Sequence, residues 1–102
     1  MKNILTITLL TTGLLAGSTA LASDDLAKAK NCLTCHSAER KIVGPSYKDI
    51  TAKRAAEKGA EAALAAKIKN GSKGEWGQVP MPPNAVSDAE AATLAKWVLT
   101  HK

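Results

Sequence analysis

Residues 31–45, NCLTCHSAERKIVGP, contain both cysteines of the 102-residue chain and one of its two histidines. Cys32 and Cys35 are separated by two residues, and His36 follows directly. A Cys-x-x-Cys pair can serve as a dithiol redox switch, as half of a zinc site, as a disulfide or as the attachment point of a haem. The features of the rest of the chain bear on which of these four interpretations applies.

The N-terminal residues have the pattern of a secretory signal peptide. Lys2 gives a positive start, residues 4–16 form an apolar run, and residues 20–22, Ala-Leu-Ala, offer a small-x-small cleavage site. An uncleaved membrane anchor is the weaker alternative, because the run falls short of the roughly 20 residues that a spanning helix needs. We therefore expect residues 1–22 to be a cleaved signal peptide and residues 23–102 to form one exported domain without stable membrane insertion.

The composition of this small domain is poor in large apolar side chains. Phenylalanine is absent, and the chain has one tyrosine and two tryptophans. A domain of this size is marginally stable without a covalent or cofactor staple. Two cysteines so close in sequence cannot join distant segments. Something else must fill the centre, and a large apolar cofactor would do so.

Helix signals dominate the first half of the domain. Asp24 or Asp25 is a suitable N-terminal cap for a first helix that runs to about Cys32. Gly-Pro at residues 44–45 indicates a loop, and Ser46 is a suitable cap for a second, short helix.

The second half contains two further helices around an irregular segment. Residues 60–70 have apolar residues at four-residue spacing and end at Asn-Gly. Residues 71–86 contain too many glycines and prolines for a long helix or a central strand. Ser87 and Glu90 then form a capping box for the last helix, on which Trp97 is expected in the core. No segment predicts a strand convincingly, so the fold class is all-α.

The pentapeptide at residues 32–36, Cys-x-x-Cys-His, is the attachment signature of c-type haem. Two thiols add to the two vinyl groups of haem, and the following His36 can then bind the iron. A thioredoxin-like dithiol would need a βαβ setting, and a disulfide would leave His36 unexplained. A zinc site would need distant His101 as its fourth ligand, with three others crowded into five residues. A covalently bound haem is therefore the preferred interpretation.

Haem iron held by His36 has a second axial position, which electron carriers fill with histidine or methionine. Met81 lies in the irregular segment between Pro80 and Pro82. A lone methionine usually fills a core, but proline flanks suit a rigid loop better than a core helix. His101 is the competitor, and its place next to the C-terminus predicts an exposed side chain. The sequence thus favours Met81 as the second ligand.

Three segments, residues 32–53, 68–87 and 94–102, resemble the small bacterial class I c-type cytochromes, specifically the cytochrome c-551 family. The resemblance covers essentially all of residues 23–102. It implies about four short helices wrapped around one covalent haem c, bound through Cys32 and Cys35 and ligated by His36 and Met81. It also implies a soluble, monomeric periplasmic one-electron carrier, not an enzyme, that serves transient redox protein partners such as a terminal oxidase, a peroxidase or a nitrite reductase.

The resemblance assigns further roles to single residues. Pro45 corresponds to a proline whose carbonyl accepts a hydrogen bond from the haem histidine. Trp76 and Lys67 correspond to residues that bind the haem propionates, and Asn84 to an asparagine near the methionine sulfur. The alternatives are packing for Trp76, a solvated helix face for Lys67 and a turn for Asn84. Some members carry aromatic residues at the positions of Ala27 and Arg54, so we expect different core packing there.

The chain has a net charge of +5. Its lysines either steer it toward acidic partner surfaces or merely keep it soluble. The lysines of residues 23–102 are Lys28, Lys30, Lys41, Lys48, Lys53, Lys58, Lys67, Lys69, Lys73, Lys96 and Lys102. Nucleic acid is disfavoured as a partner, because the protein is expected to be exported and lacks a stacking platform. The alternative function is a haem enzyme or sensor with a labile sixth ligand.

Overall fold

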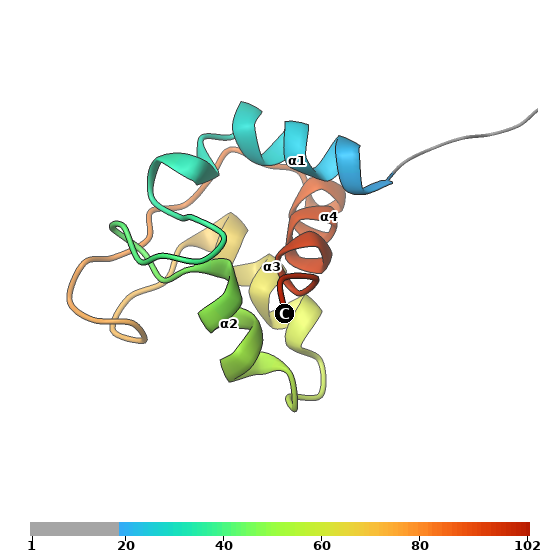
Figure 1. Cartoon of the computed structure of the whole chain (residues 1–102). Helices are drawn as coiled ribbons and strands as arrows, with labels where there is room; N and C mark the ends of the chain where they lie inside the picture. Colours follow the sequence, from blue (N-terminus) through green and yellow to red (C-terminus); the bar gives the residue numbers. More distant parts are fainter. Residues whose placement is uncertain (1–18) are drawn as a thin grey trace, which may run out of the picture.

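The computed structural model describes the backbone of residues 19–102 and the side chains of residues 23–102. Of the predicted signal peptide, everything except the backbone of residues 19–22 lies outside this described part. The helices are α1 (Thr19–Ala29), the 3-10 turn η1 (Cys32–Thr34), α2 (Tyr47–Arg54), α3 (Ala60–Asn70) and α4 (Asp88–Val98) (Figure 1). No β-strand occurs within residues 19–102, which confirms the all-α prediction. No helix in this range is long and apolar enough to cross a bilayer.

The first helix differs from the prediction at both ends. It begins upstream of Asp24 and Asp25, so these acids lie inside the helix rather than capping it, because the preceding TALAS segment contains strong helix formers. It ends before Asn31, which has a left-handed backbone with φ 62° that asparagine tolerates well. Cys32 therefore begins a separate turn instead of ending α1.

The predicted ends of α2 and α3 are confirmed. The Ser46 hydroxyl accepts a hydrogen bond of 3.0 Å from the backbone N–H of Asp49, which caps α2. α3 ends at Asn70, and Gly71 follows with φ 86°. The segment before α2 carries the predicted ligand His36, and the segment after α3 carries Met81.

The hydrophobic core lies where α2, α3 and α4 meet. Its buried members are Tyr47, Ile50, Leu64, Ala95 and Val98. Trp97 packs against this cluster, as predicted. The Thr51 hydroxyl donates a hydrogen bond of 2.9 Å to the Val98 carbonyl and so ties α2 to α4. Ala27 and Arg54, the two positions at which we expected different packing, are both buried.

The arrangement of the helices leaves one side of the fold to loops. α1 lies across one end of α4, and α2 and α3 lie near its other end (Figure 1). The segments between η1 and α2 and between α3 and α4 extend on the side away from α4 (Figure 1). These are the two segments that carry the predicted ligands His36 and Met81.

The start of α4 has the predicted capping box. The Ser87 hydroxyl accepts a hydrogen bond of 3.1 Å from the Glu90 backbone N–H, and the Glu90 carboxylate accepts one of 2.9 Å from the Ser87 backbone N–H. The hydrogen bond from the Ser87 backbone N–H, with a smaller contribution from the charge of Lys30, lowers the pKa of Glu90 below its ordinary value. A carboxyl whose pKa falls on folding stabilises the fold above its unfolded pKa, and this contribution is lost as the pH falls through the folded pKa.

We expect Ser87→Ala to lower the free energy of unfolding by about 1 kcal/mol, because one backbone N–H at the start of α4 loses its acceptor. Urea unfolding at neutral pH measures this change. Thr93→Ala is the matched control, because it removes a hydroxyl from the same helix, and this hydroxyl bonds only the Ala89 carbonyl. Glu90→Gln should differ from wild type in stability near neutral pH and converge with it as the pH falls into the acid range. An equal loss for the two hydroxyl variants would contradict the capping role.

Candidate functional site

The turn η1 brings the two thiols and the imidazole together. The backbone N–H groups of Cys35 and His36 both donate to the Cys32 carbonyl, at 3.3 Å and 3.0 Å. Both cysteines are half-buried and free, so they do not form the disulfide that was one alternative. Burial raises the pKa of the Cys32 thiol, and a backbone hydrogen bond offsets part of this effect. The turn therefore presents two sulfur atoms and one imidazole from five consecutive residues.

The imidazole of His36 has a fixed orientation. Its Nδ1 lies 2.7 Å from the carbonyl oxygen of buried Pro45, the contact that the resemblance implied. Because a carbonyl oxygen can only accept, Nδ1 carries the hydrogen and Nε2 of the neutral ring keeps its lone pair. The Tyr47 ring stacks on the imidazole, with centroids 5.4 Å apart. His36 is thus held as the tautomer that a metal ion binds through Nε2.

Gly44 leaves room for this imidazole, a role that the sequence reasoning missed. A Cβ atom at Gly44 would lie 2.5 Å from Cε1 and 2.9 Å from Nδ1 of His36. The Gly44 backbone N–H also donates to the Cys35 carbonyl at 2.8 Å. Glycine is therefore required at this position because the His36 ring comes close to the backbone, not because the chain turns there. In the sequence, only the position of Gly44 next to Pro45 could have indicated this.

Met81 is held in the irregular segment by backbone pairing. Its backbone N–H and carbonyl pair with Ser72, at 2.7 Å and 3.0 Å. A Cβ atom at Gly71 would lie 2.7 Å from the Met81 carbonyl, so the end of α3 and the Met81 backbone are in close contact. The Asn84 side chain donates to the Ile68 carbonyl at 2.8 Å and so attaches the far end of the segment to α3. The predicted contact of Asn84 with the methionine sulfur stays a prediction.

One cavity of about 890 Å³ joins these parts. Cys32, Cys35, His36 and Met81 all line it, although they come from two separate segments. Its lining also includes Pro45, Lys67, Trp76 and Asn84, so every predicted site residue borders the same space. The volume lies near the upper end of the roughly 300–1,000 Å³ typical of cofactor and ligand sites.

Charged residues form part of the cavity wall. The Lys67 side chain is 35% exposed, and its Nζ lies 2.8 Å from a carboxylate oxygen of Glu75. Trp76 is 36% exposed, and Nζ of Lys53 lies 4.5 Å from the centroid of its ring. The contact of Glu75 with Lys67 was not predicted. The only signal in the sequence is that Glu75 is an acidic residue in a stretch whose other charged residues are basic.

His101 differs from the expectation of an exposed side chain. It is half-buried, and its Nδ1 lies 3.0 Å from the Val98 carbonyl. Its ring packs on those of Tyr47 and Trp97, with centroids 5.0 Å and 4.7 Å away. Helix capping by the ring nitrogen and this aromatic packing hold the side chain in place. His101 does not line the cavity, so it does not join Met81 as a candidate ligand.

The chemistry of the lining fits a haem c. Two thiols, an imidazole with its Nε2 lone pair and a thioether are the groups that attach and ligate such a cofactor. Two buried atoms on lining residues, the Tyr47 hydroxyl and Nε of Arg54, have no hydrogen-bond partner among the described residues. A group that brings carboxylates supplies acceptors for such donors. In residues 23–102, no three His, Cys, Asp or Glu side chains are grouped to hold a metal ion, which disfavours the zinc interpretation.

Comparisons with known proteins agree with this chemistry. The family model for cytochrome c matches residues 22–102. Cytochrome c-551 of Pseudomonas aeruginosa is 57% identical over the full length of both chains, and cytochrome c-552 of Nitrosomonas europaea is 52% identical over the full length of both. The crystal structure of Nitrosomonas europaea cytochrome c552 superposes with a TM-score of 0.76 at 59% identity, over 78% of this chain and 99% of that one. The chain therefore belongs to the cytochrome c family and is a small electron-transfer protein, not an enzyme, with a covalently bound haem c.

Proposed function

We propose that this cytochrome is a soluble, monomeric periplasmic one-electron carrier whose haem iron is ligated by His36 and Met81. The observation that carries the proposal is the single cavity lined by Cys32, Cys35, His36 and Met81. The bound haem supplies the iron(III)/iron(II) couple, and the protein makes no bond to a substrate. Export is supported by the family match, which begins at residue 22, where the predicted signal peptide ends.

The residues of the site would act on this couple in three ways. The Met81 thioether favours reduced iron and so raises the reduction potential. Apolar lining residues such as Ile50 and Leu64 lower the local dielectric, which disfavours the more highly charged oxidised state. The hydrogen bond from His36 to Pro45 and the backbone pairing of Met81 hold both ligand-bearing segments, so little rearrangement is needed at each transfer.

The charges around the site support transient, electrostatically assisted contacts with redox proteins. Lys30, Lys53, Lys67 and Lys69 pair with carboxylates of the chain itself. Lys41 and Lys73 are exposed and line the cavity. We therefore assign the steering of partners mainly to Lys41 and Lys73 rather than to the lysines as a group.

We expect Met81→Ala to abolish the methionine–iron charge-transfer band of the ferric protein and to let the reduced protein bind carbon monoxide at neutral pH. Val79→Ala is the matched control, because Val79 lines the cavity from the same segment, is 67% exposed and carries no ligating atom. It should keep the band. A band that survives in Met81→Ala would exclude this ligand. Ready binding of carbon monoxide by the wild-type protein would favour the sensor or enzyme alternative instead.

We expect Gly44→Ala to displace the His36 imidazole and to lower the free energy of unfolding by about 1–3 kcal/mol, because the new methyl group overlaps the ring. Absorption and electron paramagnetic resonance spectra report the altered ligand field. Gly59→Ala is the control, because Gly59 has a positive φ but no neighbouring atom within 4 Å of the position that a Cβ atom would take. It should destabilise the fold through backbone strain and leave the spectra unchanged. Identical spectra for both variants would contradict the role of Gly44.

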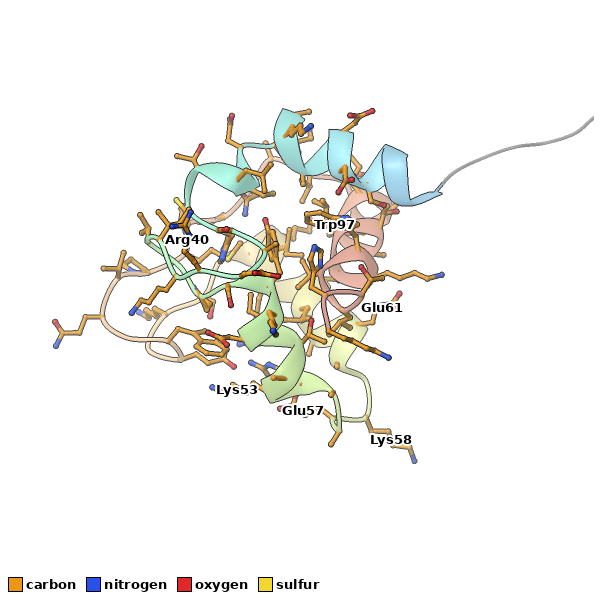
Figure 2. All side chains as sticks on the ribbon, in the orientation of Figure 1. Arg40, Lys53, Glu57, Lys58, Glu61 and Trp97 are labelled. Carbon is orange, nitrogen blue, oxygen red and sulfur yellow. The ribbon has the colours of Figure 1, made fainter. Side chains whose placement is uncertain are left out.

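We expect Lys41→Gln combined with Lys73→Gln to slow oxidation by ferricyanide, an anionic oxidant, roughly threefold at low salt. Stopped-flow kinetics at several ionic strengths measures this, and the effect should fade as salt screens exposed charges. Lys58→Gln combined with Lys96→Gln removes the same charge from exposed residues that do not line the cavity. Figure 2 shows Lys58 directed away from the fold, beyond the end of α2. Equal slowing by the two double variants would show that net charge alone, and not its position, governs the rate.

A further inference from the structure

Glu75 is an acidic residue that is held inside the wall of the haem cavity. It lies in the segment between α3 and α4, and its side chain is 18% exposed. Its carboxylate contacts Nη2 of Arg54 and lies 2.8 Å from Nζ of Lys67. Lys53 is a weaker third partner, at 3.8 Å and 44% exposed. Three cations from α2 and α3 therefore surround one carboxylate.

Arg54 connects this inner carboxylate to an outer one. It is the last residue of α2, and its side chain is 10% exposed. Its Nη1 donates to Glu57 at 2.8 Å, whereas Nη2 contacts Glu75. Glu57 is 44% exposed and does not line the haem cavity, while Arg54 and Glu75 do. Figure 2 shows Glu57 near the C-terminal end of α2, close to Lys53. One guanidinium thus has two carboxylate partners in different dielectric surroundings.

The difference in burial decides which charge can act on the haem site. Exposed charges are screened by water and salt, and an exposed pair contributes little. Buried charges interact through a lower effective dielectric and are screened much less. The charge of Glu75 therefore influences a group in the cavity more strongly than the charge of Glu57 does. A negative charge beside the cavity favours the oxidised, more positive iron, and a positive charge favours the reduced iron.

We propose that Glu75 and Arg54 act on the reduction potential of this cytochrome as an opposed pair of charges, with Glu75 lowering it and Arg54 raising it. The inference rests on the proposed one-electron function and assigns two positioning residues to it. Neither residue needs to contact the iron. The loss of one partner changes the net charge at the cavity wall, whereas the intact pair nearly cancels.

The test is the reduction potential of the haem-loaded protein and three single variants, measured by equilibrium redox titration. Glu75→Gln should raise the equilibrium constant for reduction about tenfold, which is about 59 mV for one electron. Arg54→Met should lower the constant by a similar factor, with Glu75 still paired to Lys67. Glu57→Gln removes the carboxylate that pairs with the same guanidinium on the solvent side. It should shift the reduction potential by less than a third of the shift in Glu75→Gln.

Shifts of opposite sign separate a charge effect from structural damage, because a disrupted pocket would change both variants in the same direction. Shifts of the same sign, no shift, or an equal shift in Glu57→Gln would overturn the proposal. If Glu75→Gln does not fold, a fall in the potential of Arg54→Met supports the proposal, and a rise or no change overturns it. Failure of the one-electron function itself would appear as the absence of a reversible couple in the wild-type protein.

Discussion

The hydrogen bond from His36 to the Pro45 carbonyl is the constraint on which the rest of the site depends. It selects the imidazole tautomer with a lone pair on Nε2 and fixes the plane of the ring. The bond is possible only because Gly44 has no side chain at the point where the chain passes the ring. Pro45 is buried and directly precedes the capped start of α2, so the position of His36 is tied to that of a helix.

The fold is built around the cavity more than around a conventional core. The buried cluster where α2, α3 and α4 meet contains few large side chains, and several of its members also line the cavity. A bound haem therefore completes the apolar centre as well as supplying the chemistry. The segment that carries the second ligand is held by hydrogen bonds and ion pairs of individual residues. Met81 is held by backbone bonds to Ser72 and by Asn84 at the end of α3, without a helix or sheet of its own.

Signals that act over a few residues could be predicted from the sequence. The Ser46 cap, the Ser87–Glu90 capping box and the glycine at the end of α3 all lie where the residue types indicated. The predicted start of α1 was wrong, because Asp24 and Asp25 are acceptable caps but also tolerable inside a helix whose preceding residues continue it. Local preference alone does not choose between two such starts.

Features that depend on tertiary contact were missed. His101 is next to the C-terminus, yet the rings of Tyr47 and Trp97 hold it half-buried. The resemblance implied a haem-facing role for Lys67, but it gave no sign that Glu75 would reach the same ammonium group. Both outcomes arise from residues that are distant in sequence or lie in an irregular segment, and no periodicity or motif records such a pairing.

The most direct test of the central claim is a crystal structure of the haem-loaded protein. We predict that iron is bound by Nε2 of His36 and the sulfur of Met81, with Nδ1 of His36 still within hydrogen-bond distance of the Pro45 carbonyl. Iron bound by His101, or a His36 ring that has turned away from Pro45, would contradict this claim.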